Sequence, residues 1–591
     1  MRPGNRAGSP RFSVANFGVL AALALFIGLA AYRAALVDDT LGRYVGCSRC
    51  LGGSVLANDA LLASAWMAML SACRSTRLVA LRIPLAIVAA GAVIAYGADL
   101  VVFRLLIHRL HMGDAVRFGG DPGALLSVLG PWLQTREAWM LVSGVVVAAV
   151  ATVLALAAGP ARWSHAVAWA LCAAAISVAA EAVPRVDYLH EAAVKNLWQV
   201  NRELDPRRAY SDGFRRSLGA QPRDEPACEP GMMEDLSVVL VVAESLSATH
   251  SRIVGGLRDF TPELDALAGE GSSFPEFLAN GYSTEGGLIA LLTGQVPIES
   301  AGRFGTTMAY TDVESDFHRR LRERGYLTAF FTNGALTFGQ QGEWARAIGI
   351  AHVEGAEHPY FDGMPRGVFG AARDAALVDR FLQWHSSLDP GARFMATVLT
   401  VEAHPPYADP GTGGVDEEAK IRESDRQIAR LARSLQARGF FERGVMFVVG
   451  DHRAMTPISP EERDRLGPHA AVRVLALALG RTGLAHGAVP GRFQQVELLA
   501  SLRYLIDAQS CRMPWRGRFL GAGAAPARYA LYSDPVRRNE VVVLDDGRNY
   551  RLLLDGDDTR WLVAPADAAE ADHLRNEINW QRIVRMVEFR P

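Results

Sequence analysis

The stretch SVVLVVAE, residues 237–244, decides the fold of the larger part of this chain. Its apolar residues follow one another without the alternation of a half-exposed strand, which is typical of a strand buried on both faces of a sheet. Glu244 comes at the point where such a strand would end. Because open α/β sheets bind their ligands beyond the carboxyl ends of the strands, Glu244 is a candidate site residue.

Short apolar runs of the same kind recur downstream, at 327–333, 394–401, 445–450 and 472–479. Helical segments such as 373–387 and 416–437 separate them, which predicts an α/β domain with a mainly parallel sheet covered by helices. Residues 538–563 contain Asp-Gly turns between apolar runs and predict small antiparallel hairpins. Residues 566–588 predict a terminal helix, so a small β/α subdomain should end the chain.

Residues 1–183 are instead dominated by Ala, Leu, Val and Ile. A helix crosses a bilayer with roughly 20 apolar residues, and about five segments qualify: 13–36, 55–73, 80–103, 137–158 and 163–183. No small-residue cleavage pattern follows the first segment before Asp38, which favours an uncleaved helix over a signal peptide. We therefore expect four parts: a transmembrane domain (1–183), an amphipathic periplasmic linker (184–235), a catalytic domain (236–510) and a C-terminal subdomain (511–591).

The arginines around these segments predict the orientation. Positive residues favour the cytoplasmic side, and arginines precede the first segment or lie between the second and third and between the fourth and fifth: Arg2, Arg6, Arg11, Arg74, Arg77 and Arg162. The connection between the third and fourth segments, on the expected outer side, also carries arginines, which reduces the charge difference between the two sides: Arg104, Arg109 and Arg117. Five crossings would place everything after residue 183 on the periplasmic side of a bacterial inner membrane.

Charge and cysteine content add two limits. The formal net charge of −2 gives no indication of a nucleic-acid partner. Cys47 with Cys50, and Cys228 with Cys511, would lie in an oxidising compartment if the orientation holds. Each pair can form a disulfide or stay as free thiols.

Asp451 and His452 follow the apolar run 445–450 in the way that Glu244 follows its own run. Either end alone is compatible with a solvated strand end or a helix cap. An unpaired carboxylate at a buried strand end is costly, however, and a bound cation removes that cost. Two carboxylates and an imidazole suit Zn²⁺ or Mn²⁺, so we expect one divalent metal.

Thr284, in NGYSTEGGLIALLTG, precedes an apolar helical run. There Ser283 or Thr284 can serve simply as a helix cap, or Thr284 can be a nucleophile close to a helix N-terminus that favours an anion. A threonine hydroxyl needs a base or a metal to become nucleophilic, and the candidate metal set supplies it. His404, in VEAHPPYADP, is a catalytic candidate that can protonate a leaving alkoxide or bind a phosphate oxygen, or else it is an ordinary loop histidine. His469, in GPHAAVRV, is a substrate-binding candidate for the same pocket, or else an exposed residue before a strand.

These motifs carry a family resemblance. VVAES, GYSTEGG, TVEAHPPY and GDHRAM occur in the order found in membrane-anchored transferases of the sulfatase/alkaline-phosphatase superfamily. The chain most resembles lipoteichoic acid synthases and the phosphoglycerol transferases of periplasmic glucans. The resemblance implies that Glu244, Thr284, Asp451 and His452 bind one Mn²⁺ or Zn²⁺, with Thr284 as nucleophile and His404 at the substrate head group.

Two departures limit what the resemblance implies. The C/S-x-P-x-R setting of true sulfatases is missing around Thr284, so a sulfatase reaction is not expected. The Trp and Arg that help lipoteichoic acid synthases hold glycerol phosphate have no clear counterpart, because Trp344 and Arg346 are displaced.

The expected function is transfer of glycerophosphate from phosphatidylglycerol to a periplasmic glycan through a threonine-linked intermediate. Two alternatives stay open, a phosphoethanolamine transferase and a non-catalytic membrane scaffold or sensor.

Overall fold

The computed structural model describes most of the chain. The described residues are 14–41, 50–75, 79–106, 109–111, 129–130, 132–157, 163–181, 193–202, 210–220, 224–298, 316–405, 407, 409, 414–533 and 539–587. They divide into two compact units, the first including the described residues up to 202 and the second those from 210 onwards.

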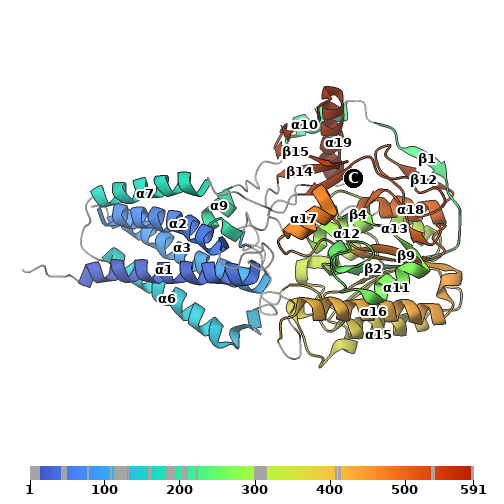
Figure 1. Ribbon diagram of the computed structural model, residues 1–591, viewed down its shortest axis with the longest axis horizontal. Coiled ribbons are helices and arrows are strands. Elements are labelled where there is room, and N and C mark those ends of the chain that lie inside the picture. Colours follow the sequence, from blue (N-terminus) through green and yellow to red (C-terminus); the bar gives the residue numbers. More distant parts are fainter. Residues whose placement is uncertain are drawn as a thin grey trace, which may run out of the picture. The chain divides into compact units, whose positions relative to one another are not determined.

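The first unit is a helical bundle (Figure 1). Its long helices are α1 (Val14–Leu41), α2 (Cys50–Ser75), α3 (Val79–Leu106), α6 (Arg136–Ala157) and α7 (Trp163–Glu181). Among the described residues, four of these helices, α1, α2, α3 and α6, are long and apolar enough to cross a membrane. The prediction of about five differs because the described apolar stretch of α7 is shorter, Ser164–Ile176.

Charged side chains are buried inside this bundle, and they are paired. Arg33 bonds to Asp59 at 2.6 Å, and Arg109 bonds to Asp99 at 2.6 Å. The hydroxyl of Tyr96 donates to Asp59 at 2.6 Å. Such pairing is what makes ionised groups tolerable among apolar helices.

The same bundle binds the segment that follows α7. The Arg33 guanidinium donates to the carbonyl oxygens of Ala193 (2.5 Å) and Lys195 (2.6 Å). The Asn196 side chain donates to the carbonyl of Asn58 at 2.8 Å. A short helix, α9 (Leu197–Arg202), continues from there.

The second unit is built on an eight-stranded sheet with the order β10-β3-β9-β8-β2-β7-β5-β6. Its strands are β2 (Ser237–Ala243), β3 (Ser272–Ser273), β5 (Leu327–Thr332), β6 (His352–Glu354), β7 (Phe394–Leu399), β8 (Gly444–Gly450), β9 (Ala476–Gly480) and β10 (Gly487–Ala488). β2 pairs in parallel with both β7 and β8, whereas β9 is antiparallel to β8. The prediction of a mainly parallel sheet is confirmed.

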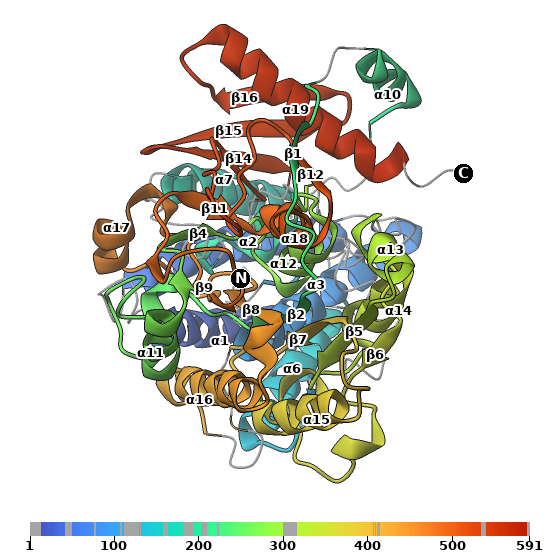
Figure 2. The same ribbon diagram turned by 90° about the vertical axis from the view of Figure 1, so that its right-hand side faces the viewer.

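Successive side chains of β2 enter the two cores on either face of the sheet. Val238, Leu240 and Val242 pack in one core, and Val239 and Val241 pack in the other. Figure 2 shows the helices that form the two outer layers. The first core is completed by α12 (Thr284–Thr293), α13 (Asp316–Glu323), α14 (Gln341–Ala347) and α18 (Leu498–Ile506), and the second by α11 (Pro262–Glu270), α15 (Asp374–Ser386) and α16 (Glu417–Ala437).

The chain ends in the expected β/α subdomain. Its antiparallel sheet has the order β13-β14-β15-β16, formed by Ala530–Ser533, Glu540–Asp545, Arg548–Asp555 and Asp558–Val563, and it is followed by α19 (Ala568–Val587). Leu552 of this sheet and Ile578 of α19 share a core with Ala290 of α12. Smaller elements are α10 (Asp212–Gly219), α17 (Pro460–Leu466) and the parallel pair β4 (Glu276–Leu278) and β11 (Arg492–Gln494).

A disulfide joins Cys228 to Cys511 across the antiparallel strands β1 (Ala227–Pro230) and β12 (Gln509–Arg512). It links positions that are 283 residues apart in the sequence. The other expected pair lies outside the described residues because of Cys47.

We expect the double substitution Cys228→Ser with Cys511→Ser to lower the thermal unfolding midpoint of the purified protein. Closing a long loop in the unfolded chain is worth about 2–4 kcal/mol. Cys73→Ser, which alters a buried free thiol, is the control for loss of a cysteine. An unfolding midpoint of the double variant equal to that of the non-reduced wild type would contradict a stabilising role for this bond.

Candidate active site

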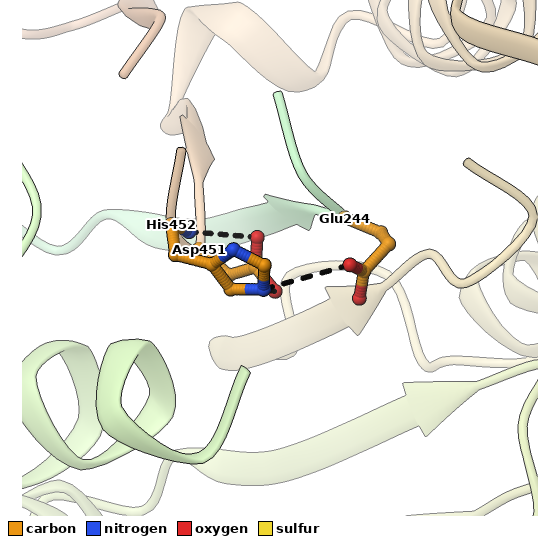
Figure 3. Close-up of side chains that lie close together, drawn as sticks. All are labelled: Glu244, Asp451 and His452. Carbon is orange, nitrogen blue, oxygen red and sulfur yellow. Dashed lines mark hydrogen bonds and ion pairs between the residues drawn. The ribbon is translucent and has the colours of Figure 1, made fainter. Parts of the chain in front are cut away.

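The site begins where two neighbouring strands end. Ala243 of β2 is paired with Gly450 of β8, so the residues that follow the two strands emerge side by side. Figure 3 shows Glu244, Asp451 and His452 converging there. His452 Nε2 lies 3.6 Å from Glu244 Oε1 and 3.3 Å from Asp451 Oδ2. All three side chains are buried.

Hydrogen bonds fix the orientation of these groups. Asp451 Oδ1 accepts from the backbone N–H of Ser245 (2.8 Å) and of His452 (2.7 Å). His452 Nδ1 lies 2.8 Å from the carbonyl of Arg453. Because a carbonyl can only accept, Nδ1 carries the proton and Nε2 presents its lone pair to the other two side chains.

The donor set fits a divalent cation. One ligand atom from each of Glu244, Asp451 and His452 lies within 4.8 Å of the others. Asp451 Oδ2 and His452 Nε2 are buried and have no hydrogen-bond partner among the described residues. Burial, followed by the nearby Asp451, raises the pKa of Glu244 well above its usual range. A cation at this point would satisfy the two free acceptors and compensate the two carboxylates.

Thr284 is the first residue of α12, and its hydroxyl donates to Glu244 Oε2 at 3.1 Å. Ser283 caps the helix, since its hydroxyl accepts from the backbone N–H of Gly286 at 3.3 Å. Ser283 thus provides the helix cap, and the hydroxyl of Thr284 is bonded to Glu244 instead. Gly287 lies against the loop that carries Asp451 and His452, and an added Cβ would come within 2.3 Å of the carbonyl oxygen of Asp451.

His404 lies in the loop after β7 and lines a pocket together with Gly367, Ala372 and Glu402. Its Nδ1 bonds to the carbonyl of Pro405, which leaves Nε2 as an acceptor. Burial lowers the pKa of His404 to about 4, and the nearby His452 adds to this effect. The imidazole is therefore neutral at pH 7.

Buried ionic contacts hold this loop in place. Asp374, at the start of α15, accepts from the backbone N–H groups of Val401 and Glu402. Glu402 accepts in turn from Lys420 at 2.7 Å. Burial, followed by the neighbouring Glu402, raises the pKa of Asp374 to about 7. Glu402, the carboxylate closest in sequence to His404, is thus already paired with the ammonium group of Lys420.

The remaining candidates have other contacts. His469 Nε2 lies 3.1 Å from the carbonyl oxygen of Asp545, in the C-terminal subdomain. Trp344 is fully buried in the core of α14. Arg346 donates to the carbonyl of Gly342 within the same helix at 3.0 Å. Each of these three side chains thus has a structural contact within the protein.

Two supporting residues were missed by the sequence analysis. Ser245 has a positive φ of 56°, uncommon for a residue with a side chain, and its hydroxyl donates to Glu244 Oε1 at 2.7 Å. Gln495 donates from its side chain to the carbonyls of Gly450 (2.9 Å) and Asp451 (2.7 Å). The motif VVAES contains the first residue, but nothing in the local pattern FQQVELL indicates the second.

Comparison with known protein families gives one match, over part of the chain. The model of the family described as Sulfatase matches residues 237–501. The search of curated proteins gives no match.

Solved structures show the same fold. A protein of the alkaline phosphatase superfamily from Vibrio parahaemolyticus is 18% identical, with a TM-score of 0.51, and the match covers 65% of this chain and 98% of that one. This similarity confirms the expected alkaline-phosphatase-like fold.

Two further solved structures are also similar. The lipoteichoic acid synthase LtaP from Listeria monocytogenes is 15% identical, with a TM-score of 0.46, and the match covers 64% of this chain and 96% of that one. The periplasmic domain of EptC from Escherichia coli is 16% identical, with a TM-score of 0.39, and the match covers 55% of this chain and 96% of that one.

We expect Glu244→Gln and Asp451→Asn to abolish tight Mn²⁺ binding, because each removes a charged ligand from a buried site. Isothermal titration of the metal-free protein measures this directly. Glu354→Gln is the matched control, since Glu354 is a buried carboxylate paired with Arg380 at 2.7 Å. Wild-type affinity in Glu244→Gln would rule out this residue as a ligand.

Proposed function

Residues 237–501 form a sulfatase-family domain of the alkaline-phosphatase superfamily, and on this basis we propose that the chain is a metal-dependent phosphotransferase. Its donor is phosphatidylglycerol, its acceptor is an extracytoplasmic glycan, and Thr284 carries the transferred glycerophosphate. The observation that carries the proposal is the hydrogen bond from Thr284 to Glu244 at 3.1 Å, beside the metal-ligand cluster.

Thr284 is well placed for attack on phosphorus. It begins a helix whose free N–H groups and dipole stabilise an anion at that point. A divalent cation held by Glu244, Asp451 and His452 would supply positive charge for the phosphoryl oxygens and lower the pKa of the hydroxyl. Phosphoryl transfer gains most of its acceleration from such electrostatic stabilisation and from positioning.

The reaction has two balanced steps. Thr284 Oγ1 forms a bond to the phosphorus of the lipid, the bond from phosphorus to the diacylglycerol oxygen breaks, and that oxygen takes up the proton that Thr284 gives up. The oxygen of an acceptor hydroxyl then forms a bond to the same phosphorus, the bond from phosphorus to Thr284 Oγ1 breaks, and Oγ1 takes up the proton that the acceptor hydroxyl gives up. Ping-pong kinetics follow from this order.

The pocket beside His404 favours a glycerol head group. His404 Nε2 is an acceptor and suits a hydroxyl donor. A phosphoethanolamine head group would need a partner for its ammonium. The carboxylate that lines the pocket, Glu402, is already bonded to Lys420. The low pKa of His404 supports a role in head-group binding rather than as a protonated acid.

Two alternatives make different demands on the site. A phosphoethanolamine transferase would use the same metal and Thr284 with another head-group contact. A non-catalytic scaffold would not require a hydroxyl hydrogen-bonded to a buried carboxylate beside two unsatisfied ligand atoms. We therefore favour the transferase.

The geometry of the helical bundle supports an extracytoplasmic site. Segment 193–196 is bound by Arg33 and Asn58, which lie in the C-terminal half of α1 and the N-terminal half of α2. If the arginine-rich N-terminus is cytoplasmic, the chain leaves the bundle on the opposite side. The disulfide between Cys228 and Cys511 fits an oxidising compartment.

Incubation of the purified protein with Mn²⁺ and a mixture of phosphatidylglycerol and phosphatidylethanolamine should leave a glycerophosphoryl group on the Thr284 peptide, detected by mass spectrometry. Thr284→Ala should lose both the adduct and diacylglycerol release. Ser283→Ala is the matched control, because it removes the adjacent hydroxyl and a helix cap worth about 1 kcal/mol while keeping the nucleophile. An ethanolamine phosphate adduct would select the second transferase, and an adduct on Ser283 would displace Thr284 as nucleophile.

A cysteine introduced at the exposed Asp572 of α19 should react with a membrane-impermeant maleimide in intact spheroplasts. One introduced at Arg6 should react only after lysis. The background carries serine at the other reactive positions: Cys47, Cys50, Cys73 and Cys172. The reverse labelling pattern would overturn the proposed orientation.

A further inference from the structure

Gln495 lies behind the metal ligands, in a short turn that is completely buried (Gln495–Glu497). Its Nε2 donates to the carbonyls of Gly450 and Asp451, at 2.9 Å and 2.7 Å. Its Oε1 accepts from the backbone N–H of Asn280 at 3.1 Å. Both ends of one side-chain amide are thus in use, each on a different loop of the site.

Asn280 precedes the segment that leads to Thr284, and it is itself fully bonded. Its Nδ2 donates to Gln494 Oε1 and to the carbonyl of Leu531, both at 2.8 Å. Its Oδ1 accepts from the backbone N–H of Val496 at 3.0 Å. Leu531 belongs to β13 of the C-terminal subdomain, so the buried amides join this subdomain to the back of the site.

The distance between the two loops matters chemically. Thr284 must stay within hydrogen-bond reach of Glu244 while Asp451 and His452 keep their ligand atoms together. Gly287 already brings α12 into direct contact with the backbone of Asp451. An amide that holds both loops removes the remaining freedom of the Gly450–Asp451 peptide, whose rotation would redirect the Asp451 side chain.

We propose that Gln495 is a positioning residue for the metal centre. Its side-chain amide fixes the Asp451–His452 loop against the loop that leads to Thr284 and makes metal affinity depend on the C-terminal subdomain. The inference rests on the metal site of the proposed function but not on the identity of the lipid or acceptor. A glutamine suits this role because it donates twice and accepts once from a single planar group.

The test measures Mn²⁺ binding alone, in the full-length protein purified in detergent. Gln495→Met keeps the length of the side chain but removes both donors and the acceptor. We expect a loss of Mn²⁺ affinity of roughly 10- to 100-fold, the scale found for groups that orient metal ligands. Ser501→Ala is the matched control, because Ser501 is equally buried, belongs to α18 rather than to either loop, and accepts from the N–H of Phe519 at 3.0 Å.

The two variants separate positioning from general stability. Both should lower the unfolding temperature of the metal-free protein, since each leaves buried polar groups unsatisfied, but only Gln495→Met should lower metal affinity. Gln495→Glu, the isosteric variant that loses donors, should act in the same direction and serves if Gln495→Met does not fold. Wild-type affinity in the folded variant would overturn this inference alone, whereas a wild type that binds no Mn²⁺ would overturn the metal site as well.

Discussion

Two carboxylates and an imidazole buried at the ends of adjacent strands are the constraint on which the rest of the catalytic unit depends. Parallel pairing of β2 with β8 brings Glu244 beside Asp451 and His452. Without a cation, burial and the neighbouring Asp451 raise the pKa of Glu244 well above its usual range. Hydrogen bonds with the Ser245 N–H, the Arg453 carbonyl and the Gln495 side chain orient these groups. Asp451 Oδ2 and His452 Nε2 have no hydrogen-bond partners among the described residues. A bound cation would satisfy these two atoms, whereas burying them without a partner costs free energy.

The position of the proposed nucleophile, Thr284, follows from the same constraint. Glu244 has two oxygens, one of which accepts from Ser245 and the other from Thr284. The carboxylate thereby connects the end of the central strand to the start of α12. Ser283 satisfies the helix cap, which leaves the threonine hydroxyl available for chemistry. A helix N-terminus directed at a metal-ligand cluster is an arrangement that favours a phosphoryl group, whatever its other substituents.

Local sequence patterns predicted the fold well because the central strands are continuous apolar runs. The run 237–243 forms β2 with the expected bounds, and Glu244 and the pair Asp451-His452 directly follow strands. Contacts between distant segments could not be predicted in this way. The link from Gln495 to Asp451 depends on tertiary packing, and the positive φ of Ser245 depends on the hydrogen bonds around it. The sequence predicted about five membrane-length helices, whereas the described residues contain four, because the described apolar stretch of α7 is shorter.

The helical bundle also contains buried charged groups, and the difference between them and the cluster at the strand ends separates a structural role from a chemical one. In the helical bundle, Arg33 bonds to Asp59, and Arg109 bonds to Asp99 through several hydrogen bonds. The carboxylates there are matched by guanidinium groups, and the surplus donors of Arg33 bind carbonyl oxygens of the segment after α7. In the catalytic unit the carboxylates face an imidazole and a hydroxyl, which cannot compensate two negative charges. The Arg–Asp pairs of the bundle hold the chain in place. The cluster at the strand ends instead keeps acceptor atoms that a cation could use. We therefore assign the proposed phosphoryl-transfer chemistry to the strand ends rather than to the bundle.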